Sequence, residues 1–421
     1  MVYVIDKNGN ALMPTSRHGM IRRLLKEKQA KVIKRCPFVI QLLKETGDVT
    51  QPITLGIDTG YKTIGISATT SSKELYSAEI MLRTNIVKLI SIRREHRRSR
   101  RARKTRYRKA KYLNRKIEKG WIAPSIKQKI QTHITAIDNI YKILPITKLI
   151  IETASFDIQK IINPDIQNKE YQNGPQNNFW NVREYVLFRD NHICQICFGK
   201  SKDNILNVHH IQSRQTGGDA PNNLITLCET CHKNLHKNII QLPTKFKRGK
   251  SYKEATTMGI MKWFLFDALK EKYQNVFMTY GYITKFNRIN ANLPKTHFVD
   301  ARCITGNALA TPLGVYYYQI KTRCHNRQIH KCKIEKGGQR KLAQTPYLVN
   351  KYRLFDKVIY KNTECFIFGR RARGFFDIRK LDGKIFVQSA SYKYLTLIEK
   401  SKKFITERRC QNEQSVIRMV F

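Results

Sequence analysis

Residues 192–238 read HICQICFGKSKDNILNVHHIQSRQTGGDAPNNLITLCETCHKNLHKN. The stretch contains two Cys-x-x-Cys pairs with thirty residues between them. At this spacing two small knuckles can offer four thiolates to one tetrahedral ion. The four cysteines are Cys194, Cys197, Cys228 and Cys231. The pattern predicts a structural zinc site that holds both ends of a finger.

Histidines in the same stretch indicate a second, different site. His232 and His236 are four residues apart, so on a helix both side chains would point the same way, and His209 would complete a metal site from a strand. His210 alternates to the other side of that strand, and a free imidazole suits a general base that activates water near neutral pH. Asn223 would hold that imidazole in position. The alternative is a zinc knuckle whose histidines are incidental.

This combination of cysteines and histidines resembles the HNH, or ββα-metal, nucleases in their zinc-finger-bearing subtype. The resemblance implies that His210 is the general base and that Asn223 positions it. It also implies three metal ligands, namely His209, His232 and His236.

The charge of the chain points to a polyanionic partner. Lys and Arg number 79 and Asp and Glu 31, which gives a net charge of +48. Nucleic acid is the natural partner for such an imbalance. No apolar run approaches the roughly 18 residues of a membrane span, and the first residues, MVYVIDKNGN, do not read as a signal peptide. The other six cysteines show no disulfide framework, which fits a reducing compartment.

Acidic residues from three distant segments form a further pattern. Asp58 lies in an apolar strand, Glu152 ends another, and His297 and Asp300 have the i, i+3 spacing that co-orients side chains on a helix. A carboxylate within an apolar strand is costly unless it meets a cation. Three such carboxylates can bind two hard ions, Mg²⁺ or Mn²⁺, that clamp a phosphodiester. The alternative for Asp58 is a turn residue before Gly60.

The order of strand Asp, strand Glu and helical His-x-x-Asp resembles the RuvC-type, RNase H-like nucleases. The resemblance implies a mixed β-sheet flanked by helices, with Asp58, Glu152 and Asp300 as metal ligands. His297 would be a general base or would orient the nucleophile. We expect the strands in 148–153 and 276–284 to be neighbours in that sheet.

Residues 93–116 contain 14 Lys or Arg among 24 residues, against one Glu, and no Pro or Gly. Such a run predicts a long helix that lies along a nucleic-acid backbone, and arginine suits phosphate geometry. The alternative is a disordered basic tail or a localisation signal. The expected contacts are Arg93, Arg94, Arg97, Arg98, Arg100, Arg101, Arg103, Arg106 and Arg108.

The last part of the chain, residues 313–421, has short strands separated by turns, which predicts a small antiparallel barrel or meander. Three arginines at one hairpin turn are expected to reach a nucleic-acid groove. They are Arg370, Arg371 and Arg373. A second zinc site is a weaker alternative because its spacing is irregular and its surroundings are cationic. It would use Cys324, His325, His330 and Cys332.

The whole order resembles the IscB proteins, which are compact, transposon-associated, RNA-guided nucleases related to the CRISPR effector nucleases. The segment ALMP at 11–14 is close to the PLMP signature of that family, with Ala11 in place of Pro. The implied fold class is a multidomain α/β protein: a split RuvC core, an inserted zinc-bearing HNH domain and a small C-terminal β-barrel. The implied segments are 1–50 (N-terminal PLMP-type domain), 51–87 (RuvC part I), 88–118 (Arg-rich bridge helix), 119–162 (RuvC part II), 163–184 (linker), 185–238 (HNH nuclease domain), 239–256 (linker), 257–312 (RuvC part III) and 313–421 (C-terminal β domain).

The IscB resemblance also implies partners and mechanism. A large structured guide RNA would pair with one strand of a double-stranded DNA target, and the C-terminal domain would read a short adjacent motif. The HNH domain would cut the guide-paired strand and RuvC the displaced strand, with Mg²⁺ or Mn²⁺ at both sites and structural Zn²⁺ in the HNH domain. We expect a monomeric protein in a cytoplasmic, nucleoid-associated ribonucleoprotein of a prokaryote. The alternatives are a protein-only structure-specific or homing nuclease, and a binding module whose sites are structural.

Overall fold

The computed structural model describes residues 1–102, 120–153, 176, 179–243, 246, 252–322, 332–334, 337, 340–342 and 345–411, without the side chains of 100–102, 215, 216, 332–334 and 340–342. The chain forms two compact units. We call Met1–Ser155 with Thr257–Phe421 the core unit, and Phe156–Thr256 the insert unit. In sequence, the insert unit therefore interrupts the core unit.

A small module begins the core unit. Strand β1 runs parallel to β3, and β2 pairs antiparallel with the other side of β3. Helix α1 buries Ile21 and Leu24 against this sheet, which gives the module an apolar core of its own. The elements are β1 (Tyr3–Ile5), α1 (His18–Lys26), β2 (Ala30–Lys34) and β3 (Val39–Leu42).

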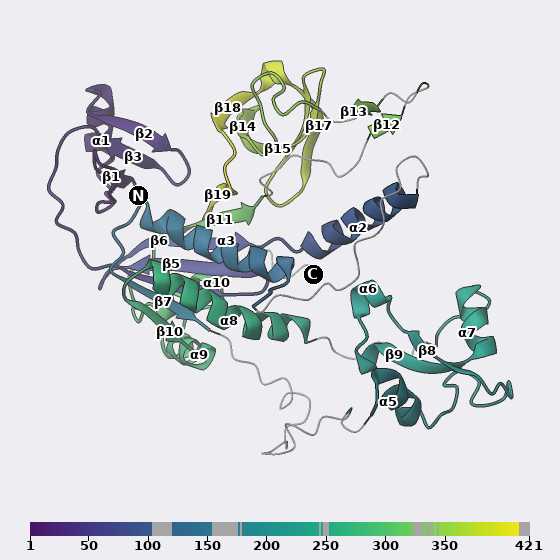
Figure 1. The fold of residues 1–421 in the computed structure, drawn as a ribbon. Coiled ribbons are helices and arrows are strands. Elements are labelled where there is room, and N and C mark those ends of the chain that lie inside the picture. Colours follow the sequence, from purple (N-terminus) through teal and green to yellow (C-terminus); the bar gives the residue numbers. More distant parts are fainter. Residues whose placement is uncertain are drawn as a thin grey trace. The chain divides into compact units, whose positions relative to one another are not determined.

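A mixed seven-stranded sheet is the centre of the core unit, in the order β10-β7-β4-β5-β6-β11-β19 (Figure 1). Neighbours are antiparallel at β4–β5, β5–β6 and β11–β19 and parallel elsewhere. The expected neighbours β7 and β10 do pair, in parallel. The strands are β4 (Thr54–Thr59), β5 (Thr63–Thr69), β6 (Glu74–Met81), β7 (Lys148–Glu152), β10 (Val276–Thr279), β11 (Val315–Lys321) and β19 (Phe404–Cys410).

Helices cover both faces of this sheet. Leu55 and Ile57 of β4 belong to one apolar core with α3 and α8, whereas the intervening Gly56 faces α10 on the other side. The strands are consequently apolar on both faces. The helices of the core unit outside the first module are α2 (Ile86–Ala102), α3 (Pro124–Tyr141), α8 (Lys253–Lys272, of which the core unit contains Thr257 onward), α9 (Gly281–Asn290) and α10 (His297–Ile304).

One predicted strand boundary in the core unit is wrong. Residues 281–284 begin α9 instead of continuing the strand of 276–284, because the chain leaves the sheet after β10 pairs with β7. Strands β11 and β19 lie within the range assigned to a separate C-terminal domain, yet both extend the central sheet through β6. Helix α8 also starts at Lys253, inside the range predicted as a linker.

Between β11 and β19 the chain forms a five-stranded antiparallel sheet, in the open order β17-β16-β15-β14-β18. Its core includes Tyr352, Val358, Ile367 and Phe376. A barrel closed through β17 and β18 is not seen among the described strand pairs. The elements are β14 (Lys357–Tyr360), β15 (Thr363–Arg371), β16 (Phe375–Arg379), β17 (Ile385–Ser391), η4 (Tyr392–Tyr394) and β18 (Thr396–Glu399), preceded by the pair β12 (Cys332–Ile334) and β13 (Arg340–Leu342).

The insert unit has a ββα arrangement. Strands β8 and β9 pair antiparallel, and α7 follows β9 directly. The elements are α5 (Val182–Arg189), β8 (Leu206–His210), α6 (Arg214–Gly217), η3 (Pro221–Asn223), β9 (Leu224–Cys228) and α7 (Glu229–His236). Of the predicted linker at 163–184, the structure describes residue 176 and residues 179–184, and α5 already begins at Val182. None of the helices in the described ranges has the length and apolar character needed to cross a membrane.

Candidate metal centres

The first candidate centre lies on the central sheet and brings together the four residues predicted for it. Asp58 is at the end of β4, Glu152 ends the neighbouring strand β7, and His297 and Asp300 lie on the first turn of α10. The Nδ1 atom of His297 is 2.6 Å from Oδ2 of Asp58. We call these four residues the carboxylate centre. Parallel pairing of β4 with β7 aligns the two strand carboxylates at one edge.

Two glycines allow α10 to lie close enough to the sheet. A Cβ added to Gly65 of β5 would overlap the backbone carbonyl of His297, and one added to Gly56 of β4 would overlap that of Ala301. Only a residue without a side chain permits such an approach between backbones. Neither glycine was predicted to matter, although both lie in otherwise apolar strands.

Burial and mutual repulsion set the electrostatics of the carboxylate centre. Burial raises the pKa of Glu152 to about 7, with the charges of Asp58 and Asp300 adding to the shift and the nearby Thr284 hydroxyl opposing it. Burial likewise raises the pKa of Asp300. The hydrogen bond to Asp58 raises the pKa of His297. A cation placed among the three carboxylates would relieve this repulsion.

Two arginines that were not predicted from the sequence accompany this centre. The Nε atom of Arg288 on α9 is 2.9 Å from Oδ1 of Asp300. On α10, Arg302 faces the fully buried carboxylate of Glu74, with 3.7 Å between Nη1 and Oε2. Glu74 also accepts hydrogen bonds from Ser67 and from the backbone of Leu313. The buried pair therefore ties α10 to β5, β6 and the segment before β11.

The second candidate centre, in the insert unit, is a cluster of four cysteines. Their sulfur atoms all lie within 4.8 Å of one another, which is the arrangement that tetrahedral Zn²⁺ requires. The four residues are Cys194, Cys197, Cys228 and Cys231. Ser201 contacts two of them, with Oγ 3.4 Å from Sγ of Cys197 and 3.1 Å from Sγ of Cys228. The donor set and the geometry fit the predicted structural zinc.

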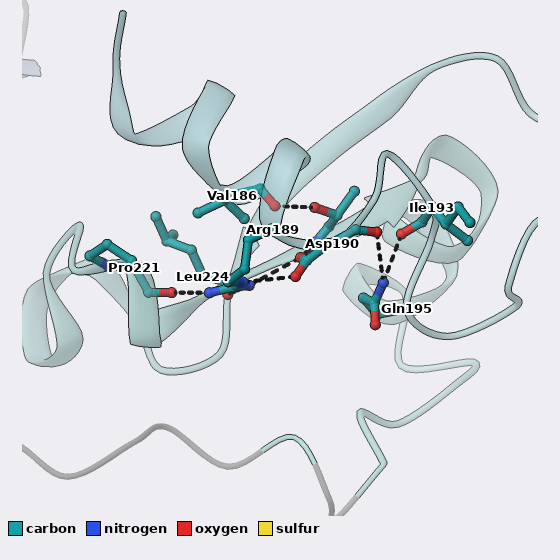
Figure 2. Close-up of polar contacts among 8 residues, drawn as sticks. Val186, Arg189, Asp190, Ile193, Gln195, Pro221 and Leu224 are labelled. Carbon is teal, nitrogen blue, oxygen red and sulfur yellow. Dashed lines mark hydrogen bonds and ion pairs between the residues drawn. The ribbon is translucent and has the colours of Figure 1, made fainter. Parts of the chain in front are cut away.

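A network around α5 attaches the first knuckle to β9 (Figure 2). Arg189 donates hydrogen bonds to the backbone oxygens of Pro221 and Leu224 and pairs with Asp190. Asp190 in turn accepts from the backbone nitrogen of Thr226 on β9. Gln195 donates to the backbone oxygens of Asp190 and Ile193 (Figure 2). The knuckle that carries Cys194 is thereby held beside the strand that ends at Cys228.

A third cluster consists of the predicted histidine ligands, His209, His232 and His236, which we call the histidine centre. One ring nitrogen of each lies within 4.8 Å of the others, and the Nε2 atoms of His232 and His236 are 3.2 Å apart. His209 comes from β8, and the other two come from successive turns of α7. The pKa of His209 is lowered to about 4 by burial and by repulsion from the other two rings. Three imidazoles that converge in this way suit a metal ion.

His210 points away from the histidine centre, as the strand alternation predicts. Its Nε2 atom is 2.9 Å from Oδ1 of Asp219, and Asp219 also pairs with Arg214. The hydrogen bond from His210 lowers the pKa of Asp219. Asp219 lies nine residues further along the chain, and no sequence pattern predicted it because only the loop brings it back to β8.

Asn223, predicted to position the His210 imidazole, makes hydrogen bonds to the loop after His210. The buried Asn223 amide bonds to the backbone of Gln212, through both its N–H and C=O, and to the carbonyl of Gly218. Asn223 therefore fixes the loop that follows His210 and carries Asp219. Gly217 packs so closely on this amide that an added Cβ would overlap it.

The predicted nucleic-acid contacts are described in part. Arg93, Arg94, Arg97 and Arg98 are exposed on α2, and Arg100 and Arg101 continue the helix. At the β15–β16 hairpin, Arg371 and Arg373 are exposed, and Arg370 donates to the backbone oxygen of Tyr347. Arg103, Arg106 and Arg108 lie outside the described residues. So do Cys324, His325 and His330 of the alternative zinc site, and the side chain of Cys332.

Comparisons with known proteins match two parts of the chain. The family model "RRXRR protein" matches residues 2–174, which include RRSRR at 97–101, and the family model "HNH endonuclease" matches residues 194–238. No curated protein matches. The HNH match spans all four cysteines, His210 and the histidine centre.

Solved structures of Streptococcus thermophilus Cas9 in complex with the AGAA PAM and with the AGGA PAM are similar at a TM-score of 0.30 and 14% identity. The matches cover 45% and 44% of this chain and 26% of each Cas9 chain, so this chain corresponds to about a quarter of their length. From the family matches, we conclude that the chain contains an HNH endonuclease domain, of the class that hydrolyses phosphodiester bonds, preceded by a region of the RRXRR type.

Proposed function

We propose that the chain is an RNA-guided DNA endonuclease that makes double-strand breaks. The observation that carries the proposal is that one chain holds two separate clusters suited to metal-dependent phosphodiester chemistry, one of them inside a matched HNH domain. Two nuclease centres of different chemistry suit the two strands of a duplex. We assign the guide-paired strand to the histidine centre and the displaced strand to the carboxylate centre.

At the histidine centre, His209, His232 and His236 would hold the ion, and a bound ion would supply charge stabilisation to the phosphate and the leaving oxygen. His210 accepts the proton of the attacking water at Nδ1, because its Nε2 atom is engaged by Asp219. Asp219 fixes the tautomer and orientation of His210. Imidazole donors suit Zn²⁺ or Ni²⁺ better than Mg²⁺, so the expected Mg²⁺ fits this donor set less well than the carboxylates.

At the carboxylate centre, Asp58, Glu152 and Asp300 would hold two Mg²⁺ or Mn²⁺ ions, whose chemistry is to clamp the attacking and leaving oxygens. His297 holds a proton between its Nδ1 atom and Asp58, which orients the imidazole toward the site. Arg288 neutralises part of the charge of Asp300. Glu152 must lose its proton before it can bind a cation, since its pKa lies near 7.

Guide RNA and target DNA are the proposed partners. The net charge of +48 requires a large polyanion, and the exposed arginines of α2 offer sequence-independent phosphate contacts. The exposed Arg371 and Arg373 place cationic groups at a hairpin tip of the C-terminal sheet, which suits contact with a groove beside the target. Guidance by RNA would leave sequence recognition to base pairing.

The test is to express the protein with its native flanking DNA, sequence the RNA that co-purifies, and add a plasmid library matched to that guide. We expect one structured RNA and metal-dependent linearisation of matched plasmids only. If RNase-treated protein cuts equally well and regardless of guide match, the protein-only structure-specific or homing nuclease replaces the proposal. If no divalent cation supports cleavage, the centres are structural.

A further inference from the structure

Exposed aromatic side chains lie on α8 and α9 and on the residue that joins β10 to α9. Strand β10 is the edge strand of the central sheet, and α9 follows it in the chain (Figure 1). On α9, Tyr282 is 71% exposed and Phe286 is 63% exposed. They are one turn apart, so both lie on one face of the helix. Tyr280, which directly precedes α9, and Trp263, which lies on α8, are also exposed. We call these four residues the aromatic platform. Exposed aromatic groups of this extent mark an interaction site.

The rings of the platform are arranged with a cation among them. Tyr280 and Tyr282 stack in nearly parallel planes, with centroids 5.9 Å apart and 9° between the planes. The Nζ atom of Lys262 lies 4.9 Å from the ring centroid of Trp263 and 5.5 Å from that of Tyr280. Aromatic faces beside an ammonium group suit a strand of unpaired nucleotides, because bases stack on the rings and phosphates meet the charge.

The platform is continuous with the carboxylate centre. Thr279 of β10 pairs with Glu152 in register, so Tyr280 is the next residue beyond that pair. Gly281, between the two stacked tyrosines, lies against Glu152, since a Cβ added there would be 3.0 Å from Oε1. A strand whose phosphodiester lies at the carboxylates would therefore place neighbouring bases at the platform.

We infer that the aromatic platform is the binding surface for single-stranded DNA entering the carboxylate centre, with bases stacked on Tyr280, Tyr282 and Phe286 and a phosphate at Lys262. The inference rests on the proposed function, because it names the form of DNA that this centre receives. A base-paired duplex keeps its bases stacked on one another and cannot offer their faces to the rings.

The test measures binding of the full-length protein to a fluorescent oligodeoxythymidine of about 12 nucleotides, within the usual length of single-strand sites. Magnesium is omitted so that cleavage plays no part, and high salt suppresses binding that depends on phosphates alone. We expect Tyr282→Ala and Phe286→Ala each to raise Kd about tenfold, or about 1.4 kcal/mol. The matched control is Tyr394→Ala, since Tyr394 is 70% exposed in η4, between β17 and β18, and we expect its Kd to equal that of the wild type.

The place where the oligonucleotide binds is identified by crosslinking one that carries 5-iododeoxyuridine and mapping the modified peptides. Crosslinks within 280–286 support the inference. Unchanged Kd in both platform variants overturns it. If the platform substitutions weaken binding of an oligouridine of the same length more than binding of the oligodeoxythymidine, the surface binds RNA. If they change the sedimentation of the free protein, the surface mediates self-association. Either result also overturns the inference.

Failure of the inference is distinguishable from failure of the proposed function. If the guided wild-type protein cuts both strands while the platform variants bind and cut as the wild type does, only the inference fails. If the wild type binds the oligonucleotide at the platform but cuts no guide-matched plasmid with any divalent cation, the proposed function fails.

Discussion

Replacing Gly65 with alanine should separate α10 from the sheet and disable the carboxylate centre. The added Cβ would overlap the carbonyl group of His297 and lie 3.1 Å from its Cβ. Favourable carbon contacts need roughly 3.5–4.0 Å, so the two backbones must move apart by about 1 Å. That movement would break the 2.6 Å contact between His297 and Asp58. Overpacking of this kind costs about 1–3 kcal/mol of stability.

The rate of displaced-strand cleavage should fall together with stability. A displacement of about 1 Å at a catalytic site can cost about 100-fold in rate. The assay follows nicking of each strand of a guide-matched supercoiled plasmid, with thermal unfolding measured in parallel. We expect the displaced-strand rate to fall about 100-fold and the guide-paired-strand rate to stay at the wild-type value, because the histidine centre belongs to another unit.

The matched control for Gly65→Ala is Gly259→Ala on α8. A Cβ at Gly259 meets nothing within 4 Å, and alanine favours a helix by about 1 kcal/mol. This variant should cut both strands normally and unfold no earlier than the wild type. The reasoning is refuted if Gly65→Ala cuts the displaced strand at the wild-type rate with an unchanged Tm.

Three further predictions concern other parts of the molecule. Glu74→Leu leaves Arg302 buried without its partner, so urea denaturation should show a loss of about 3–5 kcal/mol in the free energy of unfolding. The raised pKa of Glu152 means that the magnesium-free fold binds this proton more tightly than the unfolded chain does. The protonated Glu152 therefore stabilises the fold below pH 4.5, and this stabilisation is lost as pH rises through about 7. The free energy of unfolding should fall by about 2 kcal/mol over that range, after allowance for solvent screening. Urea titrations of the wild type and of Glu152→Gln measure the difference. Cys194→Ser should lose the zinc measured by elemental analysis and the protection of the insert unit from proteolysis.

Controls are available for each of these changes. Glu45→Ala removes an exposed carboxylate 3.9 Å from Lys7 and should change stability by less than about 0.5 kcal/mol. Cys410→Ser removes an exposed cysteine outside the cluster and should retain zinc. Parallel pH profiles for the wild type and Glu152→Gln would contradict the assigned pKa, and equal zinc content in both cysteine variants would contradict the four-cysteine site.

Local spacing rules explain what the sequence predicted about the centres. The i, i+4 pair His232 and His236 share a face of α7, and alternation along β8 separates His209 from His210. The same rules placed His297 and Asp300 on one turn of α10. These relations depend on a few consecutive residues, so the sequence alone determines them.

Contacts between elements that are distant in the sequence explain what the sequence did not predict. Arg288 reaches Asp300, and Gly65 admits α10, only because separate elements pack together. Asn223 bonds to Gln212 because η3 directs its amide into the loop. Strands β11 and β19 join the central sheet because β6 offers a free edge, which no local pattern in 313–421 records.

The central claim is that each centre cuts its own strand, and strand-specific nicking by two single variants tests it most directly. Guided wild-type protein, Asp58→Ala and His210→Ala are given the same supercoiled plasmid, and each product strand is resolved on a denaturing gel. We predict that Asp58→Ala nicks only the guide-paired strand and that His210→Ala nicks only the displaced strand. If either variant cuts both strands, or if each abolishes cleavage of both, the assignment of one centre to one strand is contradicted.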